Sequence, residues 1–492
     1  MAGHKNDGVK RTPFLGFQGH AAMRAINAIR MGGVDVLPLV EGGKGVSISN
    51  GISAGNWALA GGVGTFSAVN ADSFDLDGHP IPQTYQGRTR RERHEELINY
   101  AVQGALTQAR RAWDITGGKG RIHANILWEM GGAERIAVEM LEQAKGLIHG
   151  ITCGAGMPYR LSDIAARFGV YYYPIISSAR AFNALWKRAY SKTAELLGGV
   201  VYEDPWLAGG HNGLSNGEDP TRPEDPYPRV MALRKVMREF GLAQTPIIMA
   251  GGVWCLEDWE NWIDNPELGP VAFQFGTRPL LTQESPIGSA WKQKLLTLKE
   301  GDVFLNRFSP TGFYSSAVNN GFIQELRERS ERQVAYTTEV VGEHVAEYGV
   351  GPRKRIVYLT NADRNRVVEW ERQGFVEALR TPDSTLVFVT PDKAAEILQD
   401  QTDCMGCLST CRFSNWAQHE PDFNNGKRAD PRSFCIQKTL QDIAHTSDDP
   451  ATLDRNLMFS GHNAYRFGLD PFYSNGFIPT VKQLMERLLT GR

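Results

Sequence analysis

Residues 200–213 read Val-Val-Tyr-Glu-Asp-Pro-Trp-Leu-Ala-Gly-Gly-His-Asn-Gly and join a short apolar run to a glycine-rich loop. The run Val200–Glu203 is rich in β-branched and aromatic residues, which predicts a strand. The loop Ala208–Gly213 offers bare backbone N–H groups and one imidazole where that strand ends. Such a loop is typical of the active-site face of a parallel α/β barrel.

Seven further segments have strand composition, which gives eight predicted strands: Val34–Val40, Gly64–Val69, Arg121–Leu127, Leu147–Thr152, Tyr172–Ser177, Pro246–Ala250 and Val271–Phe275. Amphipathic segments lie between most of them, and we predict helices at Arg91–Trp113, Ala133–Ala144, Ala179–Glu195, Arg229–Phe240 and Leu256–Ile263. Alternating βα units over about 250 residues predict a TIM (β/α)8 barrel rather than an open doubly wound sheet. No G-x-G-x-x-G motif follows a strand and opens a helix, which removes the main competitor.

Glycine-rich loops also follow the fourth, seventh and eighth predicted strands. They are Thr152–Pro158, Ala250–Val253 and Phe275–Arg278. The loops after strands seven and eight of such barrels commonly hold a phosphate on backbone N–H groups. One glycine alone would indicate only a tight turn. Four glycine-rich loops that each directly follow a predicted strand favour a phosphorylated cofactor.

Four cysteines near the end of the chain have metal-ligand spacing. Three of the six cysteines form the pattern C-x2-C-x3-C and one follows later: Cys404, Cys407, Cys411 and Cys435. An iron–sulfur cluster is favoured, because four-cysteine zinc sites more commonly use two C-x2-C pairs. Zinc and unrelated buried thiols remain the alternatives. Cys153 and Cys255 lie among apolar residues and are predicted to be core thiols.

The composition is that of an enzyme without a strong electrostatic field. With 53 basic and 55 acidic residues among 492, no global charge attracts nucleic acid or anionic membranes. No stretch approaches about 18 uninterrupted apolar residues, so no membrane span is expected. The opening residues 1–11 are polar and lack the apolar core of a secretion signal. We therefore expect a cytoplasmic enzyme.

Five barrel segments carry a family resemblance: Ile151–Pro158, Pro174–Arg180, Gly209–Gly213, Ile247–Trp254 and Gln274–Arg278. They resemble the nitronate monooxygenase (2-nitropropane dioxygenase-like) flavoproteins, which bind FMN in a TIM barrel and include flavin-dependent enoyl reductases. The cysteines and Phe459–Arg466 resemble an iron–sulfur branch of that family, which includes the bifunctional acyl-carrier-protein dehydrogenase/isomerase of unsaturated fatty acid synthesis. The resemblance covers about residues 34–325 and 402–490.

The strand-end positions and the resemblance together predict an FMN site and a [4Fe–4S] cluster. The cluster ligands would be the four cysteines 404, 407, 411 and 435. The flavin phosphate would lie on the last two strand-end loops, and the predicted flavin contacts are Gly42, Gly43, Asn125, Gly154, Ser177, Gly209, Gly210, Gly251, Gly252, Gln274, Gly276 and Thr277.

His211 is the predicted catalytic base, because two glycines precede it at a strand end. His20 and His462 are weaker candidates. The resemblance implies that His211 removes the proton α to an acyl thioester carbonyl while hydride from the β carbon goes to the flavin. The same base would then move a proton to yield a 3-enoyl isomer.

Other functions remain open at this point. The alternatives within the family are oxidation of alkyl nitronates with O2 and flavin-dependent enoyl reduction. Outside it, the chain could be a structural zinc protein whose barrel has lost flavin, or a scaffold subunit that binds an acyl carrier without turnover.

Two departures from the family pattern stand out. Residues 41–45 read Glu-Gly-Gly-Lys-Gly where relatives have Gln-Gly-Gly-Met-Gly, which places an extra pair of charges near the expected flavin. Residues 328–402 have no counterpart in compact relatives and are predicted to form a small inserted α/β module. Its predicted elements are strands at Arg355–Thr360 and Leu386–Val389 and helices at Arg364–Leu379 and Lys393–Leu398.

The predicted organisation is an N-terminal extension (1–33), the FMN barrel (34–327), the inserted module (328–402) and a cluster-binding segment packed on the barrel (403–492). A homodimer is allowed, and an acidic acyl carrier protein is a candidate partner. It would need a basic patch beside the pocket mouth, and the dense basic clusters are Arg88, Arg90, Arg91 and Arg93, or Arg353, Lys354 and Arg355.

Overall fold

The computed structural model of the chain describes residues 26–75, 77–445 and 449–491. Most of the predicted N-terminal extension lies outside the described residues. The polar opening stretch and His20 are among the residues left out.

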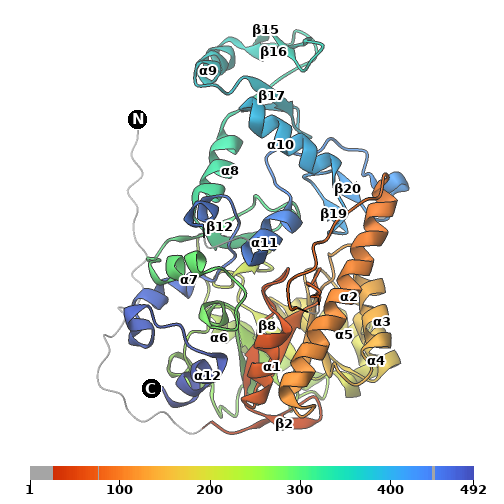
Figure 1. The fold of residues 1–492 in the computed structure, drawn as a ribbon, viewed down its shortest axis with the longest axis vertical. Coiled ribbons are helices and arrows are strands. Elements are labelled where there is room, and N and C mark those ends of the chain that lie inside the picture. Colours follow the sequence, from red (N-terminus) through yellow and green to blue (C-terminus); the bar gives the residue numbers. More distant parts are fainter. Residues whose placement is uncertain (1–25, 76, 446–448, 492) are drawn as a thin grey trace.

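Eight parallel strands form a closed barrel, which confirms the predicted TIM fold (Figure 1). The last strand pairs with the first, and Phe273 lies opposite Leu39. The barrel strands are β3 (Leu39–Glu41), β4 (Val63–Ser67), β5 (Arg121–Leu127), β6 (Gly150–Gly154), β7 (Tyr171–Ile176), β8 (Val200–Glu203), β10 (Ile247–Ala250) and β11 (Val271–Phe275).

The predicted first strand, Val34–Val40, is two strands. β2 (Val34–Val36) pairs antiparallel with β1 (Ile29–Met31), and the barrel strand begins only at Leu39. Pro38 separates them because it has no backbone N–H to donate to a ladder. Its carbonyl still accepts a hydrogen bond from Phe273 N at 2.8 Å, at the point where β3 enters the barrel.

Helices surround the barrel: α1 (Gly51–Leu59), α2 (Arg90–Thr116), α3 (Ala133–Gln143), α4 (Leu161–Phe168), α5 (Ala179–Arg188) and α6 (Pro226–Glu239). The long α2 begins at a capping box formed by Thr89 and Glu92 and ends at Gly117, whose φ is +58°. It extends beyond the barrel towards the C-terminal segments (Figure 1).

Two predicted helices differ in detail. The segment Ala179–Glu195 contains α5 and a separate 3-10 helix, η1 (Tyr190–Leu196). Tyr190 is fully buried and its hydroxyl donates to Pro158 O at 2.9 Å, so tertiary packing overrides the helical periodicity there. The segment Leu256–Ile263 is likewise a 3-10 helix, η2 (Glu257–Trp262), rather than an α-helix.

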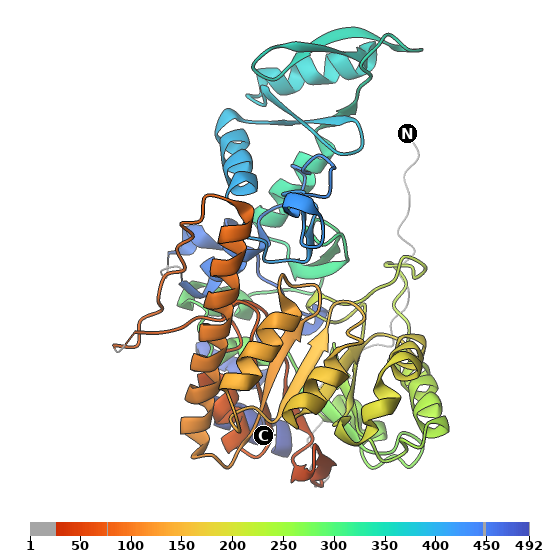
Figure 2. The ribbon, with the colours of Figure 1, turned by 90° about the vertical axis from the view of Figure 1, so that its right-hand side faces the viewer.

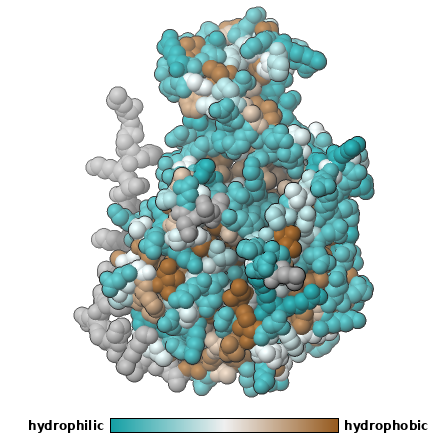
Figure 3. All heavy atoms as spheres, in the orientation of Figure 1, coloured by the Kyte–Doolittle hydropathy of each residue, from teal (hydrophilic) through white to brown (hydrophobic). Residues whose placement is uncertain are grey.

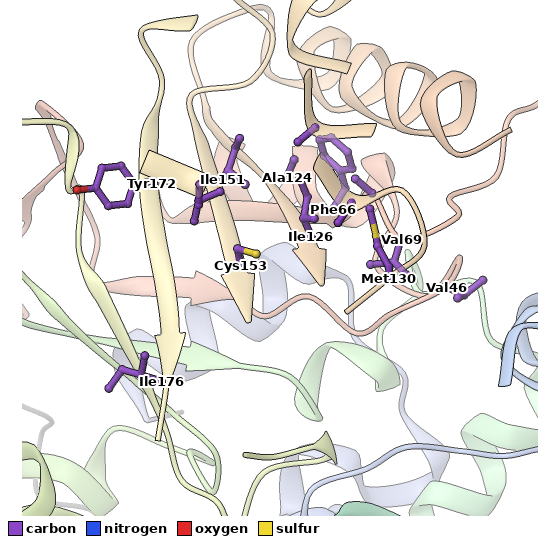
Figure 4. Close-up of a cluster of buried hydrophobic side chains, with 14 of the residues drawn as sticks. Val46, Phe66, Val69, Ala124, Ile126, Met130, Ile151, Cys153, Tyr172 and Ile176 are labelled. Carbon is purple, nitrogen blue, oxygen red and sulfur yellow. The ribbon is translucent and has the colours of Figure 1, made fainter. Parts of the chain in front are cut away.

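The barrel core is apolar and continuous with the helix layer. Figure 4 shows Phe66, Ala124, Ile126 and Ile151 on neighbouring strands with Cys153 among them. Cys153 is fully buried, and burial raises the pKa of its thiol, as expected of a core thiol. Cys255 is only half-buried, and its sulfur lies 3.8 Å from Arg466 Nη2.

Residues 328–402 project beyond the barrel (Figures 1 and 2). After α8 (Gly321–Glu331) the elements are β14 (Gln333–Ala335), β15 (His344–Val350), β16 (Arg355–Thr360), α9 (Asn361–Arg372), β17 (Glu377–Arg380), β18 (Thr385–Val389) and α10 (Pro391–Thr402). They enclose a small apolar core around Val357, Val367 and Phe388. The domain boundaries themselves stay a prediction.

Within this module, the predicted helix Arg364–Leu379 is wrong beyond Arg372. Gly374 adopts a φ of +94°, which a helix does not continue through, and residues Glu377–Arg380 form β17. The hairpin partner β15 was not predicted, because its sequence mixes charged, glycine and apolar residues.

The remaining elements cover the mouth of the barrel or pack beside it. A three-stranded sheet of β12 (Val303–Asn306), β13 (Ser315–Val318) and β9 (Gly210–His211) lies over the strand ends. The other elements are η3 (Arg278–Leu281), α7 (Ser289–Leu296), β19 (Thr410–Cys411), β20 (Trp416–Ala417), η4 (Pro421–Phe423), α11 (Ile436–His445), η5 (Pro450–Asp454), η6 (His462–Gly468), η7 (Pro471–Gly476) and α12 (Val481–Thr490).

The surface is mostly hydrophilic on the face shown in Figure 3, with apolar residues in small separate patches. None of the helices in the described part of the chain has the length and apolar character needed to cross a membrane.

Candidate active site

A cavity opens at the carboxyl ends of the barrel strands and has about 1770 Å³ of empty volume, its mouth included. We call the part built by the strand-end loops the inner wall. The part built by the cysteine-rich segment and the residues that follow it is the outer wall, and it consists of Cys407, Leu408, Ile436, Gln437, Leu440, Ile443 and 457–461.

Eleven of the twelve predicted flavin contacts lie on the inner wall: Gly42, Gly43, Asn125, Gly154, Gly209, Gly210, Gly251, Gly252, Gln274, Gly276 and Thr277. Ser177 is the exception. Its hydroxyl donates to Gly213 O at 3.0 Å instead of lining the cavity. The structure thus brings together residues that lie more than 230 positions apart in the sequence.

The inner wall needs glycine at several points. A Cβ added to Gly43 would lie 2.2 Å from the Asn125 side chain. Gly251 and Gly252 have φ of +84° and +76°, which side chains rarely adopt. Gly276 does not need to be glycine, because an added Cβ there would meet nothing within 4 Å, so the cavity is open at this point. These bare backbones form a cradle for a flat ring and an anionic tail, so the residues present fit FMN.

A strap from the C-terminal segment closes over the last two strand-end loops. Gly461 N donates to Thr277 Oγ1 at 3.0 Å, and Asn463 Nδ2 donates to Gly252 O at 2.6 Å. His462 does not line the cavity, and its Nε2 lies 3.0 Å from Ser316 Oγ. The sequence singled out residues 459–466 only by their family resemblance. Their contact with these two loops could be seen only in the folded structure.

His211 reaches the cavity from β9, which pairs with β13 opposite Ser315. Its Nε2 lies 2.6 Å from Ser309 Oγ, and the Phe459 ring packs edge-on at 5.4 Å. Burial lowers the pKa of His211 to about 4. The imidazole is therefore neutral at pH 7 and able to accept a proton.

Glu203 is a cavity residue that sequence reasoning missed. It ends β8, lines the inner wall, and keeps only part of its surface open to the cavity. Burial, followed by the charge of Asp204, raises the pKa of Glu203 to about 8. At pH 7 this carboxyl is thus protonated. Its position at the end of the predicted strand Val200–Glu203 was the signal that could have identified it.

The extra charges of residues 41–45 form a buried ion pair. Lys44 Nζ lies 2.8 Å from Glu41 Oε1, and Ser53 donates to the same oxygen at 2.6 Å. Lys44 is the only Lys or Arg among the described residues that line the cavity. Because Glu41 neutralises it, the pair adds polarity to the inner wall without adding net charge.

The four cysteines of the predicted cluster come together beneath the outer wall. Burial and then the neighbouring thiols raise the pKa of Cys407, and Ser414 donates to Cys404 Sγ at 3.1 Å. No three of the four sulfurs all lie within 4.8 Å of one another in the described chain. A tetrahedral zinc site would place its sulfurs about 3.8 Å apart.

The cysteine loop is fastened to the barrel. Gly131 N donates to Cys407 O at 2.9 Å, and Ser409 donates to the carboxylate of Glu129, a cavity residue, at 2.6 Å. From α2, Arg93 Nε donates to Cys404 O at 3.1 Å. Arg90 likewise donates to Ser414 O at 2.8 Å.

Neither predicted basic cluster borders the cavity. Arg90 and Arg93 of the first cluster hold the cysteine segment, as just described. Arg353 and Arg355 of the second cluster lie on the projecting module, and none of these residues is part of the cavity lining.

The nitronate monooxygenase family profile matches residues 121–386, more than half of the chain. The chain is similar in structure to the enoyl reductase domain of MlnA from the macrolactin biosynthesis cluster of Bacillus amyloliquefaciens, with 13% identity, coverage of 92% of this chain and 93% of that one, and a TM-score of 0.52. FabK from Thermotoga maritima aligns over 92% of this chain and 91% of its own at 14% identity, with a TM-score of 0.47.

A nitroalkane oxidase from Streptomyces ansochromogenes covers 59% of this chain and 78% of its own at 17% identity, with a TM-score of 0.40. No curated protein matches the sequence. The likeness to the MlnA domain supports the barrel fold, and the family profile carries the assignment. Its matched range includes the His211 loop and the two loops that form the glycine cradle, so the chain belongs to the nitronate monooxygenase family of FMN-dependent oxidoreductases.

Proposed function

We propose that this protein oxidises the acyl group of an acyl thioester with FMN, using His211 as the base, and isomerises the product. The single observation that carries the proposal is the outer wall. Ile436, Leu440 and Ile443 lie four and three residues apart on α11, so they share one helix face, and all three line the cavity.

An apolar wall of this extent favours an apolar chain as substrate. Leu457, Met458 and Phe459 continue it beyond α11. Each methylene removed from water contributes about 0.8 kcal/mol, so such a wall selects long acyl groups over small polar ones. A small nitronate gains little from it. The acyl carrier, either CoA or an acyl carrier protein, the homodimer and the cytoplasmic location stay predictions.

The chain's own groups supply the proton chemistry. Neutral His211 takes the proton from the carbon α to the thioester carbonyl, and Ser309 holds its Nε2. FMN, when bound, accepts the hydride that leaves the β carbon. After oxidation and release of the first proton, His211 takes a proton from the γ carbon of the 2-enoyl chain and returns it to the α carbon, which gives the 3-enoyl isomer. Protonated Glu203 offers an O–H donor for the charge that develops on the carbonyl.

The four cysteines hold a [4Fe–4S] cluster in this proposal, and their C-x2-C-x3-C pattern with one later cysteine supports that choice over zinc. Cys435 directly precedes α11. Ligation at Cys435 would therefore fix the helix that forms the apolar outer wall.

A second candidate is oxidation of alkyl nitronates, and the family match favours it. A nitronate anion has already lost its proton, so it does not need a base. Replacing His211 should therefore slow the acyl reaction much more than the nitronate reaction, which distinguishes the two candidate functions.

The test is flavin reduction without oxygen, followed by absorbance, with an acyl thioester and with an alkyl nitronate. On the thioester, His211→Ala should lose about 10²- to 10⁴-fold in rate, while FMN content stays unchanged. On the nitronate the variant should keep much of its rate. His79→Ala, at an exposed histidine that does not line the cavity, is the matched control.

Reduction of the wild type by the nitronate alone would reject the acyl proposal in favour of the second candidate. Thioester oxidation at the parent rate in His211→Ala would show that another group is the base.

A further inference from the structure

A second groove lies between the projecting module and the cysteine-rich segment, and it shares no residue with the barrel cavity. Its walls are the β15–β16 turn, the end of β17, the C-terminal half of α10 and the loop 428–431. The empty volume is about 1080 Å³ with its open side included, which is room for a molecule of nucleotide size.

Four arginines converge on this groove from segments far apart in the chain. Arg353 and Arg355 flank the tip of the hairpin, Arg380 ends β17, and Arg428 lies in the loop between Cys411 and Cys435. No Asp or Glu is among the described residues that line the groove. None of the four forms an ion pair within the described part of the chain.

Four guanidinium groups without carboxylate partners repel one another, so the arrangement is stabilised by an anion. The planar fork of arginine matches phosphate oxygens with two parallel hydrogen bonds. Arg380 is also held in place, because its guanidinium lies 5.4 Å from the Tyr336 ring centre.

The rest of the lining adds an apolar floor and one unused donor. Leu379, Leu398 and Pro431 line the groove, and Leu398 is 50% exposed. Gln401 also lines it, and its buried Nε2 has no hydrogen-bond partner. A buried amide N–H without a partner is costly, and a ligand acceptor would satisfy it.

We propose that this groove binds a small molecule with a nucleoside diphosphate unit. The arginines would contact the two phosphates, and the apolar floor would receive the base. Free nucleotides and CoA both carry this unit, so the shared chemistry is what the groove recognises. The site would act apart from the barrel cavity, and it does not depend on the proposed acyl chemistry.

Calorimetric titration of the purified full-length protein tests the proposal with pyrophosphate, ADP and CoA as probes. ADP should bind more tightly than pyrophosphate, because only ADP reaches the apolar floor. Equal affinity for ADP and CoA would identify the free nucleotide as sufficient, and tighter CoA binding would identify CoA as the source. Raising the salt concentration should weaken ADP binding, since Arg353, Arg355 and Arg428 are exposed to solvent.

Arg380→Ala and Arg428→Ala should each weaken ADP binding about tenfold, the loss expected for one charge-assisted phosphate contact. Lys354→Ala is the matched control, because Lys354 lies in the same turn but does not line the groove. Arg428 is exposed in a loop, so its variant tests binding without threatening the fold.

Three outcomes would overturn the proposal. ADP could fail to bind, it could bind no better than pyrophosphate, or both arginine variants could bind as the Lys354 control does. If poly-glutamate bound and ADP did not, the groove would be a docking site for an acidic protein instead. Since binding is measured without turnover, failure here leaves the proposed function intact, and failure of the His211 test leaves this site intact.

Discussion

The inner and outer walls of the cavity are built on opposite principles. The inner wall carries polar side chains such as Asn125 and Gln274, and part of its shape comes from positions that only glycine fits, as at Gly43 and Gly251. The outer wall is largely apolar, and its apolar side chains on α11 and at residues 457–459 come from a different part of the chain. In the proposal, the first wall holds the cofactor and the second selects the substrate.

This difference explains why the two halves of the site can vary separately. A cradle of bare backbone tolerates few substitutions, because an added Cβ clashes or strains the chain. An apolar helix face can change side chains of similar volume at a cost usually below about 1.5 kcal/mol. Substrate choice can therefore change while the flavin site stays the same.

The largest expected effect comes from removing one of the four cysteines, which should disturb the outer wall and leave the inner wall in place. Cys407→Ser should reduce iron from about four atoms per chain to near zero, if the cysteines hold one [4Fe–4S] cluster. The outer wall should then lose order, because α11 follows directly after Cys435. FMN should remain bound, since the strand-end loops that form the inner wall belong to the closed barrel. Iron assay, flavin content and thermal unfolding measure the three quantities.

Cys153→Ser is the control, because Cys153 is a core thiol outside the four-cysteine cage. Unchanged iron and unchanged unfolding in Cys407→Ser would contradict the cluster assignment. Loss of FMN together with iron would show that the two walls are not independent.

The two walls also differ in how far the sequence predicts them. The inner wall follows from local patterns, since each loop stands directly after a β-branched strand and such loops meet at one face of a parallel barrel. That reasoning located Gly252, Gln274 and Gly276 on the cavity. It placed Ser177 there too, although the hydroxyl of Ser177 bonds to Gly213 O instead.

The outer wall could not be predicted in this way. The residues Ile436, Leu440 and Ile443 have the periodicity of any amphipathic helix, and nothing local distinguishes packing on a core from lining a cavity. Glu203 was missed for a related reason, because its raised pKa comes from burial that only the fold creates. The end of the predicted helix at Leu379 was wrong because Gly374 stops it.

A smaller effect is expected from reshaping the outer wall alone. Leu440→Trp should fill part of the cavity and reduce kcat/KM for long acyl thioesters about 10- to 100-fold relative to short ones. FMN and iron content should not change. Lys438→Trp, on the exposed face of the same helix, is the matched control. An equal loss for long and short chains would mean that this helix face does not contact the acyl group.

The smallest effect concerns the inner wall and depends on pH. Glu203 shares the cavity with Glu129, His211 and the Lys44 ion pair, and its pKa of about 8 keeps it protonated at pH 7. As the pH rises through about 8, the carboxyl loses its proton, so it stops donating and adds a negative charge where the substrate carbonyl becomes negative. The rate of thioester oxidation should therefore decline several-fold from pH 7 to pH 9.

Glu203→Gln keeps an N–H donor but cannot ionise, so its pH–rate profile should stay level over that range while its rate at pH 7 stays near the parent value. A decline of the same size in the Gln variant would assign the alkaline limb to another group and leave Glu203 as a structural residue at the end of β8.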